Sequence, residues 1–281
     1  MRIPIVNTIS KAISKKAKKL TSRPYSRFNI SWTQEKYYKH ATEHKRYVHK
    51  YSDDVSVIFY NPQEFLHAIK EIFIDEVYLF KPKTKEPVII DCGGFIGLSA
   101  LYFKLQYPES KVIVYEPDKK NFFIAEKNIS SWKNIKDITL INKAIWINEE
   151  PIEFIQTNDM SSAIVYDKTH NVQSNIVKVE TERLKNILNQ QVDFLKIDIE
   201  GAEYEVLKDI DSSLTNVDNV FIEYHGLYTE MYKLNTIFSI LEKNNYKWYI
   251  KEADNVYPRP FYDKSKVALY DLQLNIFAFK D

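Results

Sequence analysis

Charged side chains alternate with apolar ones through residues 194–203, FLKIDIEGAE. Because successive side chains of a strand point to opposite faces, Lys196, Asp198 and Glu200 would share one face of a strand here. Central strands of parallel sheets are normally apolar on both faces, and an unpaired buried charge strongly destabilises a fold. We therefore expect these side chains to be paired, or to lie at the open end of the strand, where they could contact a ligand.

A second polar face follows in the run FIEYH, where Glu223 and His225 alternate with apolar residues. If the two strands are neighbours in a parallel sheet, their ionisable side chains converge at one edge. His225 is then the natural general base, because histidine titrates near neutral pH. Two ordinary explanations stay open: Lys196 could pair with Glu223 across the ladder, and Glu200 and Glu203 could simply stabilise a helix N-terminus. For Glu203 we favour this second explanation.

Three of the chain's five glycines fall within the stretch VIIDCGGFIGLSA. Asp91 would end a strand, Gly93 and Gly94 would form the turn, and Gly97 would then open a helix. The dinucleotide fingerprint requires a glycine where Cys92 stands. An acidic residue at the tip of the first strand suits a ligand with an ammonium group, so the turn favours S-adenosylmethionine over a ligand that presents a pyrophosphate.

Glu116 ends the next strand-like run, 19 residues after Gly97. A carboxylate at this position can accept hydrogen bonds from both ribose hydroxyls of a nucleoside. The alternative is a glycine turn made for helix packing together with a surface glutamate, and the paired spacing favours the nucleoside site.

An alternation of strands and helices would position these residues. We expect strands at residues 88–91, 111–116, 138–145, 192–199 and 220–224, and helices from 98 and over 119–129, 203–210 and 231–244. Such alternation predicts an α/β fold with a doubly wound, mainly parallel sheet. Two closing strands, 247–252 and 274–279, lack a helix between them and should pair antiparallel. A β-rich insertion is expected at about 151–180.

The first part of the chain differs in character. Residues 1–27 hold eight basic side chains and no acid, so the remainder carries a net charge of −7. Apolar residues recur every three or four positions through residues 1–20, which predicts a basic amphipathic helix. It could contact a membrane surface, bind nucleic acid, or pack on the domain. We divide the chain into a helical N-terminal extension, 1–60, and a domain, 61–281.

Two further observations bound the class of protein. Residues 40–44, HATEH, fit a zinc pattern, but no third ligand is evident nearby and we interpret them as a solvated helical face. One cysteine excludes an intramolecular disulfide, and no apolar stretch is long enough to span a bilayer. We expect a soluble, cytoplasmic protein, with peripheral contact to the inner membrane face left open.

Taken together, VIIDCGGFIGLSA, VYEPDKKNF, INKAIW and FLKIDIEGAEYEVLK followed by FIEYH resemble the FkbM family of S-adenosylmethionine-dependent methyltransferases. The resemblance implies a Rossmann-like, seven-stranded sheet. It places the cofactor on the glycine turn and Asp91, its ribose on Glu116, and further contacts at Asn142, Ala144 and Asp198. The family usually has D-x-G-A-N-x-G at the turn, whereas this chain has Gly94 and Phe95 in place of alanine and asparagine.

The resemblance also implies transfer of a methyl group to a hydroxyl of a sugar, glycan or related small molecule. We expect His225 or Asp198 to act as the base, Lys196 to position the acceptor, and Glu223 to belong to the same catalytic group. A divalent metal is not expected, although Asp198, Glu200 and His225 could hold one. The oligomeric state is left open.

Three rival functions remain. An RNA 2′-O-methyltransferase would use a similar charged edge, with the basic N-terminus on RNA. A nicotinamide-dependent dehydrogenase would keep the glycine turn and Glu116 but would not need the charged strand face. A non-catalytic binding protein that descends from a methyltransferase would not need to keep the charged cluster intact.

Overall fold

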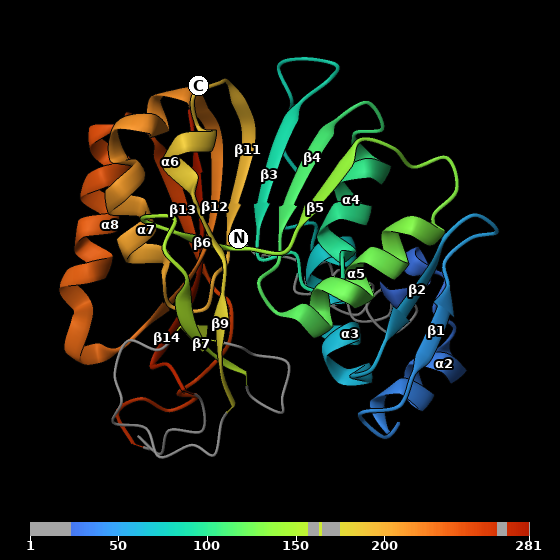
Figure 1. Cartoon of the computed structure of the whole chain (residues 1–281). Coiled ribbons are helices and arrows are strands. Elements are labelled where there is room, and N and C mark those ends of the chain that lie inside the picture. The colour runs from blue at the N-terminus through green and yellow to red at the C-terminus, as the bar shows by residue number, and fades with distance from the viewer. Residues whose placement is uncertain (1–23, 157–162, 165–174, 263–268, 281) are drawn as a thin grey trace, which may run out of the picture. The chain divides into compact units, whose positions relative to one another are not determined.

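The computed structural model describes residues 24–156, 163–164, 175–262 and 269–280 (Figure 1). The chain forms two compact units, Met1–Val77 and Tyr78–Asp281. The boundary lies after Val77 rather than at residue 60, because the segment after residue 60 packs within the first unit. The Phe65 ring, for example, stacks on the Phe59 ring with centroids 3.9 Å apart. The amphipathic helix expected at residues 1–20 lies outside the described residues.

The described part of the first unit mixes helices with a hairpin. In chain order its elements are η1 (Pro24–Phe28), α2 (Trp32–Lys39), β1 (Tyr47–Lys50), β2 (Ser56–Phe59), α3 (Pro62–Ala68) and η2 (Ile69–Ile74). Strands β1 and β2 pair antiparallel. The expectation that residues 1–60 are helical is therefore wrong for this hairpin. The core of the unit is aromatic, and Phe28, Phe59 and Phe65 are buried in it.

Residues 40–44 form a turn instead of a helical face. His40 closes α2, and His44 adopts a left-handed conformation with φ of 64°. The two imidazoles therefore do not share one face of a helix, which the zinc pattern would require.

The second unit is built on a sheet of seven strands in the order β13-β14-β12-β11-β3-β4-β5. The strands are β3 (Val88–Cys92), β4 (Lys111–Tyr115), β5 (Ile138–Ile141), β11 (Val192–Ile197), β12 (Val217–Gly226), β13 (Lys247–Glu252) and β14 (Leu272–Phe279). The pairs from β12 through β5 are parallel, and β14 is antiparallel to both β12 and β13. The predicted fold class, including the antiparallel closing strands, is confirmed.

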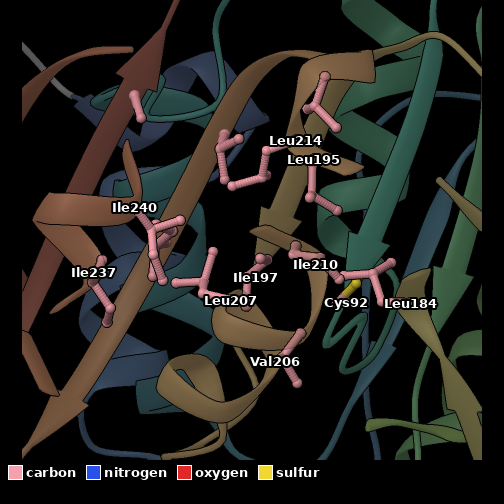
Figure 2. Close-up of a cluster of buried hydrophobic side chains, with 14 of the residues drawn as sticks. Cys92, Leu184, Leu195, Ile197, Val206, Leu207, Ile210, Leu214, Ile237 and Ile240 are labelled. Atoms are coloured by element: carbon pink, nitrogen blue, oxygen red, sulfur yellow. The ribbon is translucent and has the colours of Figure 1, made fainter. Parts of the chain in front are cut away.

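Helices cover both faces of this sheet. Apolar side chains of α6 (Leu184–Ile187), α7 (Glu203–Ile210) and α8 (Met231–Lys243) pack with Leu195 and Ile197 of β11 in one buried cluster, shown in Figure 2. Phe194 points to the other face, where its ring contacts Phe103 of α4 (Leu98–Gln106) at 5.4 Å. Helix α5 (Lys119–Ser131) connects β4 and β5.

The segment between β5 and β11 forms smaller sheets. The run predicted as one strand over 138–145 divides into β5 and β6 (Ala144–Trp146), and β6 pairs with β10 (Thr181–Arg183). Strands β7 (Ile152–Gln156), β8 (Ala163–Ile164) and β9 (Asn175–Val179) make a three-stranded antiparallel sheet. This sheet is the β structure that the sequence predicts between residues 151 and 180.

Within the described ranges, no helix is both long enough and apolar enough to cross a membrane.

Candidate active site

The turn between β3 and α4 is held by backbone hydrogen bonds to the adjacent strand β4. The N–H groups of Gly93 and Gly94 donate to the carbonyl oxygen of Tyr115 at 2.9 and 3.0 Å. A Cβ on Gly93 would lie 1.9 Å from the carbonyl oxygen of Asp198, and φ of Gly93 is 98°. Only glycine fits this position, and the turn is thereby wedged between the ends of β4 and β11.

Asp91 lies below this turn and does not reach solvent, since its side chain is fully buried. Its Oδ2 accepts a hydrogen bond from the Ser99 hydroxyl at 2.5 Å, and its Oδ1 lies 3.2 Å from Nζ of Lys196. Burial raises the pKa of Asp91, although Lys196 and Ser99 oppose the shift. The carboxylate of Asp91 thus holds Lys196 and the start of α4 in place. The sequence had instead suggested a direct contact between Asp91 and the cofactor.

Lys196 links the glycine turn to the charged strand. Its buried Nζ donates to the carbonyl oxygen of Gly93 at 2.6 Å and lies 3.1 Å from Oδ2 of Asp198. Burial lowers its pKa, but Asp198 and Asp91 outweigh burial and raise the pKa well above its usual range. Lys196 is therefore a fixed cation, and its partners are Asp91 and Asp198 instead of Glu223.

Glu116 lies on the other side of the same turn. Its Oε2 accepts from the N–H of Phe95 at 2.7 Å and its Oε1 from the N–H of Asp118 at 2.9 Å. Burial raises the pKa of Glu116 to about 8, and these two hydrogen bonds only partly oppose the shift. Phe95 has φ of 48°, a left-handed conformation that asparagine adopts more readily than phenylalanine.

The two remaining residues expected near the cofactor differ in position. Asn142 follows β5, and its Nδ2 donates to the carbonyl oxygens of Glu116 and Pro117 at 2.8 and 3.1 Å. Asn142 therefore supports the segment that carries Glu116. Ala144 is buried in β6, where its N–H donates to the carbonyl oxygen of Glu180.

A cluster of carboxylates surrounds His225 near the end of β12. Nδ1 of His225 lies 3.2 Å from Oε1 of Glu203, and Nε2 lies 3.8 Å from both Oε2 of Glu200 and Oε1 of Glu223. Three potential metal-ligand atoms, one each from Asp198, Glu200 and His225, lie within 4.8 Å of one another. The structure thus brings together the five ionisable side chains that the sequence predicted to converge, and it adds Glu203.

The turn after β11 is what brings Asp198 and Glu200 toward His225. Strand β11 ends at Ile197, two residues earlier than predicted, and Glu200 and Gly201 adopt φ of 54° and 101°. Tyr270 holds this turn, because its hydroxyl donates to the carbonyl oxygen of Glu200 at 2.7 Å. Asp198 and Glu200 are therefore gathered by a tight turn and not by the alternation of a strand.

The charges of the cluster shift its titration. Burial lowers the pKa of His225, but Glu203, Glu200 and Glu223 outweigh burial and raise the pKa well above 6.5. Burial raises the pKa of Glu200 to about 7, against the opposing effect of His225. These carboxylates favour the charged imidazolium of His225, which differs from the neutral base that its intrinsic pKa suggested.

The second unit is similar to known methyltransferases. The methyltransferase FkbM domain matches residues 91–248, which is more than half of the chain and includes the glycine turn, Glu116 and both charged strands. The chain belongs to the FkbM methyltransferase family. It is therefore an S-adenosylmethionine-dependent methyltransferase, and the dehydrogenase alternative is wrong.

Relatives of this FkbM methyltransferase include enzymes of fungi and bacteria. The chain is 30% identical to Methyltransferase 1 of Beauveria bassiana over 200 residues, which cover 61% of this chain and 79% of the relative. It is 26% identical to the 2-O-methyltransferase NoeI of Sinorhizobium fredii over 176 residues, 56% of this chain and 71% of the relative. A solved structure, methyltransferase FkbM from Methylobacillus flagellatus, is 18% identical with a TM-score of 0.45, covering 71% of this chain and 45% of that one.

Three residues of this FkbM methyltransferase site were missed by the sequence reasoning. Glu203 looked like an ordinary acid of a first helical turn, yet it is fully buried and also accepts from the N–H groups of Ile199 and Gly201. Its position two residues after a glycine was the available signal. Ser99 and Tyr270 gave none, because a serine in a helix and a tyrosine in a loop are common.

Proposed function

We propose that this FkbM methyltransferase transfers the methyl group of S-adenosylmethionine to a hydroxyl oxygen of a sugar, glycan or related small molecule. The observation that carries the proposal is the placement of two carboxylates on opposite sides of one glycine turn. Strand β3 lies between β4 and β11, so Glu116 flanks the turn on one side and Asp198 on the other. A ligand lying across the turn has its ribose at Glu116 and its reactive end at Asp198.

The residues around the turn fit this cofactor. Gly93 is partly exposed, so a ligand can approach its backbone, and a side chain at Gly93 or Gly94 would collide with neighbouring atoms. Glu116 is fixed at both oxygens by backbone N–H groups and retains lone pairs for two ribose hydroxyls. Asn142 supports this contact through the carbonyl oxygen of Glu116.

S-adenosylmethionine supplies an activated methyl group, which passes to the acceptor oxygen as its bond to sulfur breaks. The protein must therefore align the acceptor and receive its proton. We assign the proton to Asp198, because its carboxylate is partly exposed and pairs with Lys196, which also donates to the carbonyl oxygen of Gly93. Lys196 fixes that carboxylate, while Glu223 and His225 border the acceptor site.

A hydroxyl acceptor is supported by one relative. NoeI, which is 26% identical, is described as a 2-O-methyltransferase. The abundance of carboxylates in the site also suits hydrogen bonds from an acceptor with several hydroxyl groups.

The experiment that tests the proposal is calorimetric titration of the full chain with S-adenosylhomocysteine, in parallel with Glu116→Ala and with NAD as a second ligand. At pH 9, where Glu116 is ionised, we expect binding that Glu116→Ala weakens about tenfold or more, since the ribose loses charge-assisted hydrogen bonds. Glu126→Ala, a change on the exposed side of α5, is the matched control and should bind like the unchanged chain. Equal binding by all three proteins would show that Glu116 does not hold the ribose.

A second measurement addresses the acceptor. Transfer of labelled methyl groups to oligosaccharides, but not to RNA, is the expected result. Salt-dependent transfer to RNA would instead support the RNA 2′-O-methyltransferase alternative.

A further inference from the structure

We propose that Asp198, Glu200 and His225 form a binding site for one divalent cation beside the acceptor position. The inference rests on the proposed function for its catalytic meaning, but the site itself is defined by side chains that the structure places together. Within the described ranges, these are the His, Cys, Asp and Glu side chains whose ligand atoms come near enough to share an ion.

The spacing is close to that of a coordination shell. The ligand atoms lie within 4.8 Å of one another, with 3.8 Å between Nε2 of His225 and Oε2 of Glu200. A cation with ligand distances of about 2.1 Å separates its ligand atoms by about 3 to 4 Å. The side chains of Asp198 and Glu200 are 25% and 35% exposed, so they have room to rotate toward a shared ion.

The histidine is oriented as metal ligands usually are. Its Nδ1 is held by the buried carboxylate of Glu203 at 3.2 Å. Among the described residues, its Nε2 makes no hydrogen bond and faces Glu200 and Glu223 instead. Ligating histidines typically give their second ring nitrogen to a carboxylate, which fixes the tautomer and leaves the first nitrogen for the metal. The side chain of His225 is only 3% exposed, so this orientation is set by packing.

The charges point to a cation as well. Four carboxylates, those of Asp91, Asp198, Glu200 and Glu203, lie beside two cationic side chains, Lys196 and His225. Oε2 of Glu203 is buried without a hydrogen-bond partner in the described part of the chain. A cluster with this excess of negative charge is stabilised by an added cation.

Two carboxylates and one imidazole suit a cation that accepts both oxygen and nitrogen, such as Mn²⁺ or Mg²⁺. The partial exposure of Asp198 and Glu200 leaves positions for water or for the acceptor hydroxyl. Coordination would make that hydroxyl more acidic, so that it loses its proton more easily as it attacks the methyl group.

The test uses the full chain after dialysis against a chelator, titrated with Mn²⁺ and followed by the loss of the electron paramagnetic resonance signal of free Mn²⁺. We expect one bound Mn²⁺ per chain, displaced by Mg²⁺, with affinity reduced at least about tenfold in Glu200→Gln. Glu205→Gln is the control, because it removes the same charge from α7. Glu205 lies 4.0 Å from Lys208 and outside the cation site, so this change should leave the Mn²⁺ affinity unchanged. Binding that is absent, or equal in all three proteins, would overturn the proposal.

Two further readouts keep the result interpretable. Glu203→Gln should lower Mn²⁺ affinity about 10- to 100-fold, because His225 loses the carboxylate that orients it. This variant provides a second test if Glu200→Gln does not fold. S-adenosylhomocysteine is titrated separately with chelator present. If the chain binds S-adenosylhomocysteine but not Mn²⁺, only the cation-site proposal is wrong. If it binds Mn²⁺ but not S-adenosylhomocysteine, the proposed function is wrong and the cation site is supported.

Discussion

Lys196 is the residue on which the glycine turn and the charged strand both depend. It is buried with two carboxylates and a carbonyl oxygen around it. Removing one partner of a buried ion pair typically costs about 3–5 kcal/mol, because the other charges remain buried and unpaired. We therefore expect Lys196→Met to lower the free energy of unfolding by about this amount.

Urea denaturation measures this effect, and Lys208→Met is its control. Lys208 is half-exposed and pairs with Glu205 at 4.0 Å, so its loss should cost less than about 1 kcal/mol. Similar losses for the two variants would show that the buried pairs of Lys196 do not stabilise the fold.

The raised pKa of Glu116 should make the affinity for the cofactor increase with pH. Because its pKa is raised to about 8 in the empty site, the carboxyl is mostly protonated at pH 7 and ionised at pH 9. A ribose that donates to the carboxylate binds the ionised form, so affinity should increase with pH. We expect the dissociation constant for S-adenosylhomocysteine to fall about tenfold between pH 7 and pH 9.

Calorimetry at several pH values checks this, with Glu116→Gln as the reference. The variant cannot ionise at this position, and any pH dependence it retains belongs to other groups. A wild-type profile as flat as that of the variant would mean that the ribose does not contact this carboxylate.

At the scale of elements, the turn between β3 and α4 shows two different reasons for a glycine. A Cβ at Gly93 meets the backbone of Asp198, while a Cβ at Gly97 would have its nearest neighbours at an ordinary 3.6 Å. Gly97→Ala should therefore cost about 1–2 kcal/mol for the left-handed conformation alone. Gly93→Ala should cost about 1–3 kcal/mol more, because the backbone of Asp198 must move.

Thermal and urea unfolding of the two variants distinguish these contributions. Gly97→Ala should keep measurable binding of S-adenosylhomocysteine, and Gly93→Ala should lose it. Equal stability of the variants would show that the turn and Asp198 can separate without cost.

The elements themselves were largely predictable, because hydrophobic runs and glycine positions reflect local geometry. Gly97 at the start of α4 and the limits of β13 follow the sequence closely. The turn at Asp198 to Gly201 did not, since alternating side chains look like a continuing strand. The roles of Glu203 and Tyr270 depend on contacts between distant segments, which no local pattern reports.

At the scale of the molecule, charge is distributed unevenly along the chain. Residues 1–20 carry six basic side chains and no acid, whereas the chain as a whole has a net charge of only +1. These residues lie outside the described part of the structure, and their sequence pattern supports a proposal that they bind an anionic membrane surface.

Removal of residues 1–20 tests that proposal. We expect the shortened chain to lose binding to vesicles that contain anionic lipid, while its affinity for S-adenosylhomocysteine stays the same. Vesicle binding that survives the deletion would show that this segment is not the membrane contact, and lost binding to RNA instead would favour a nucleic-acid role.

The position of β14 between β12 and β13 has a consequence for biosynthesis. Both neighbours, which end at Gly226 and Glu252, are translated before Leu272–Phe279, so the strand that joins them arrives last. Until then, the nascent chain carries an unpaired edge on β12, the strand that bears His225. Unpaired edges invite intermolecular pairing, so a ribosome stalled before residue 272 would leave a chain that is prone to aggregate and cannot yet position its histidine.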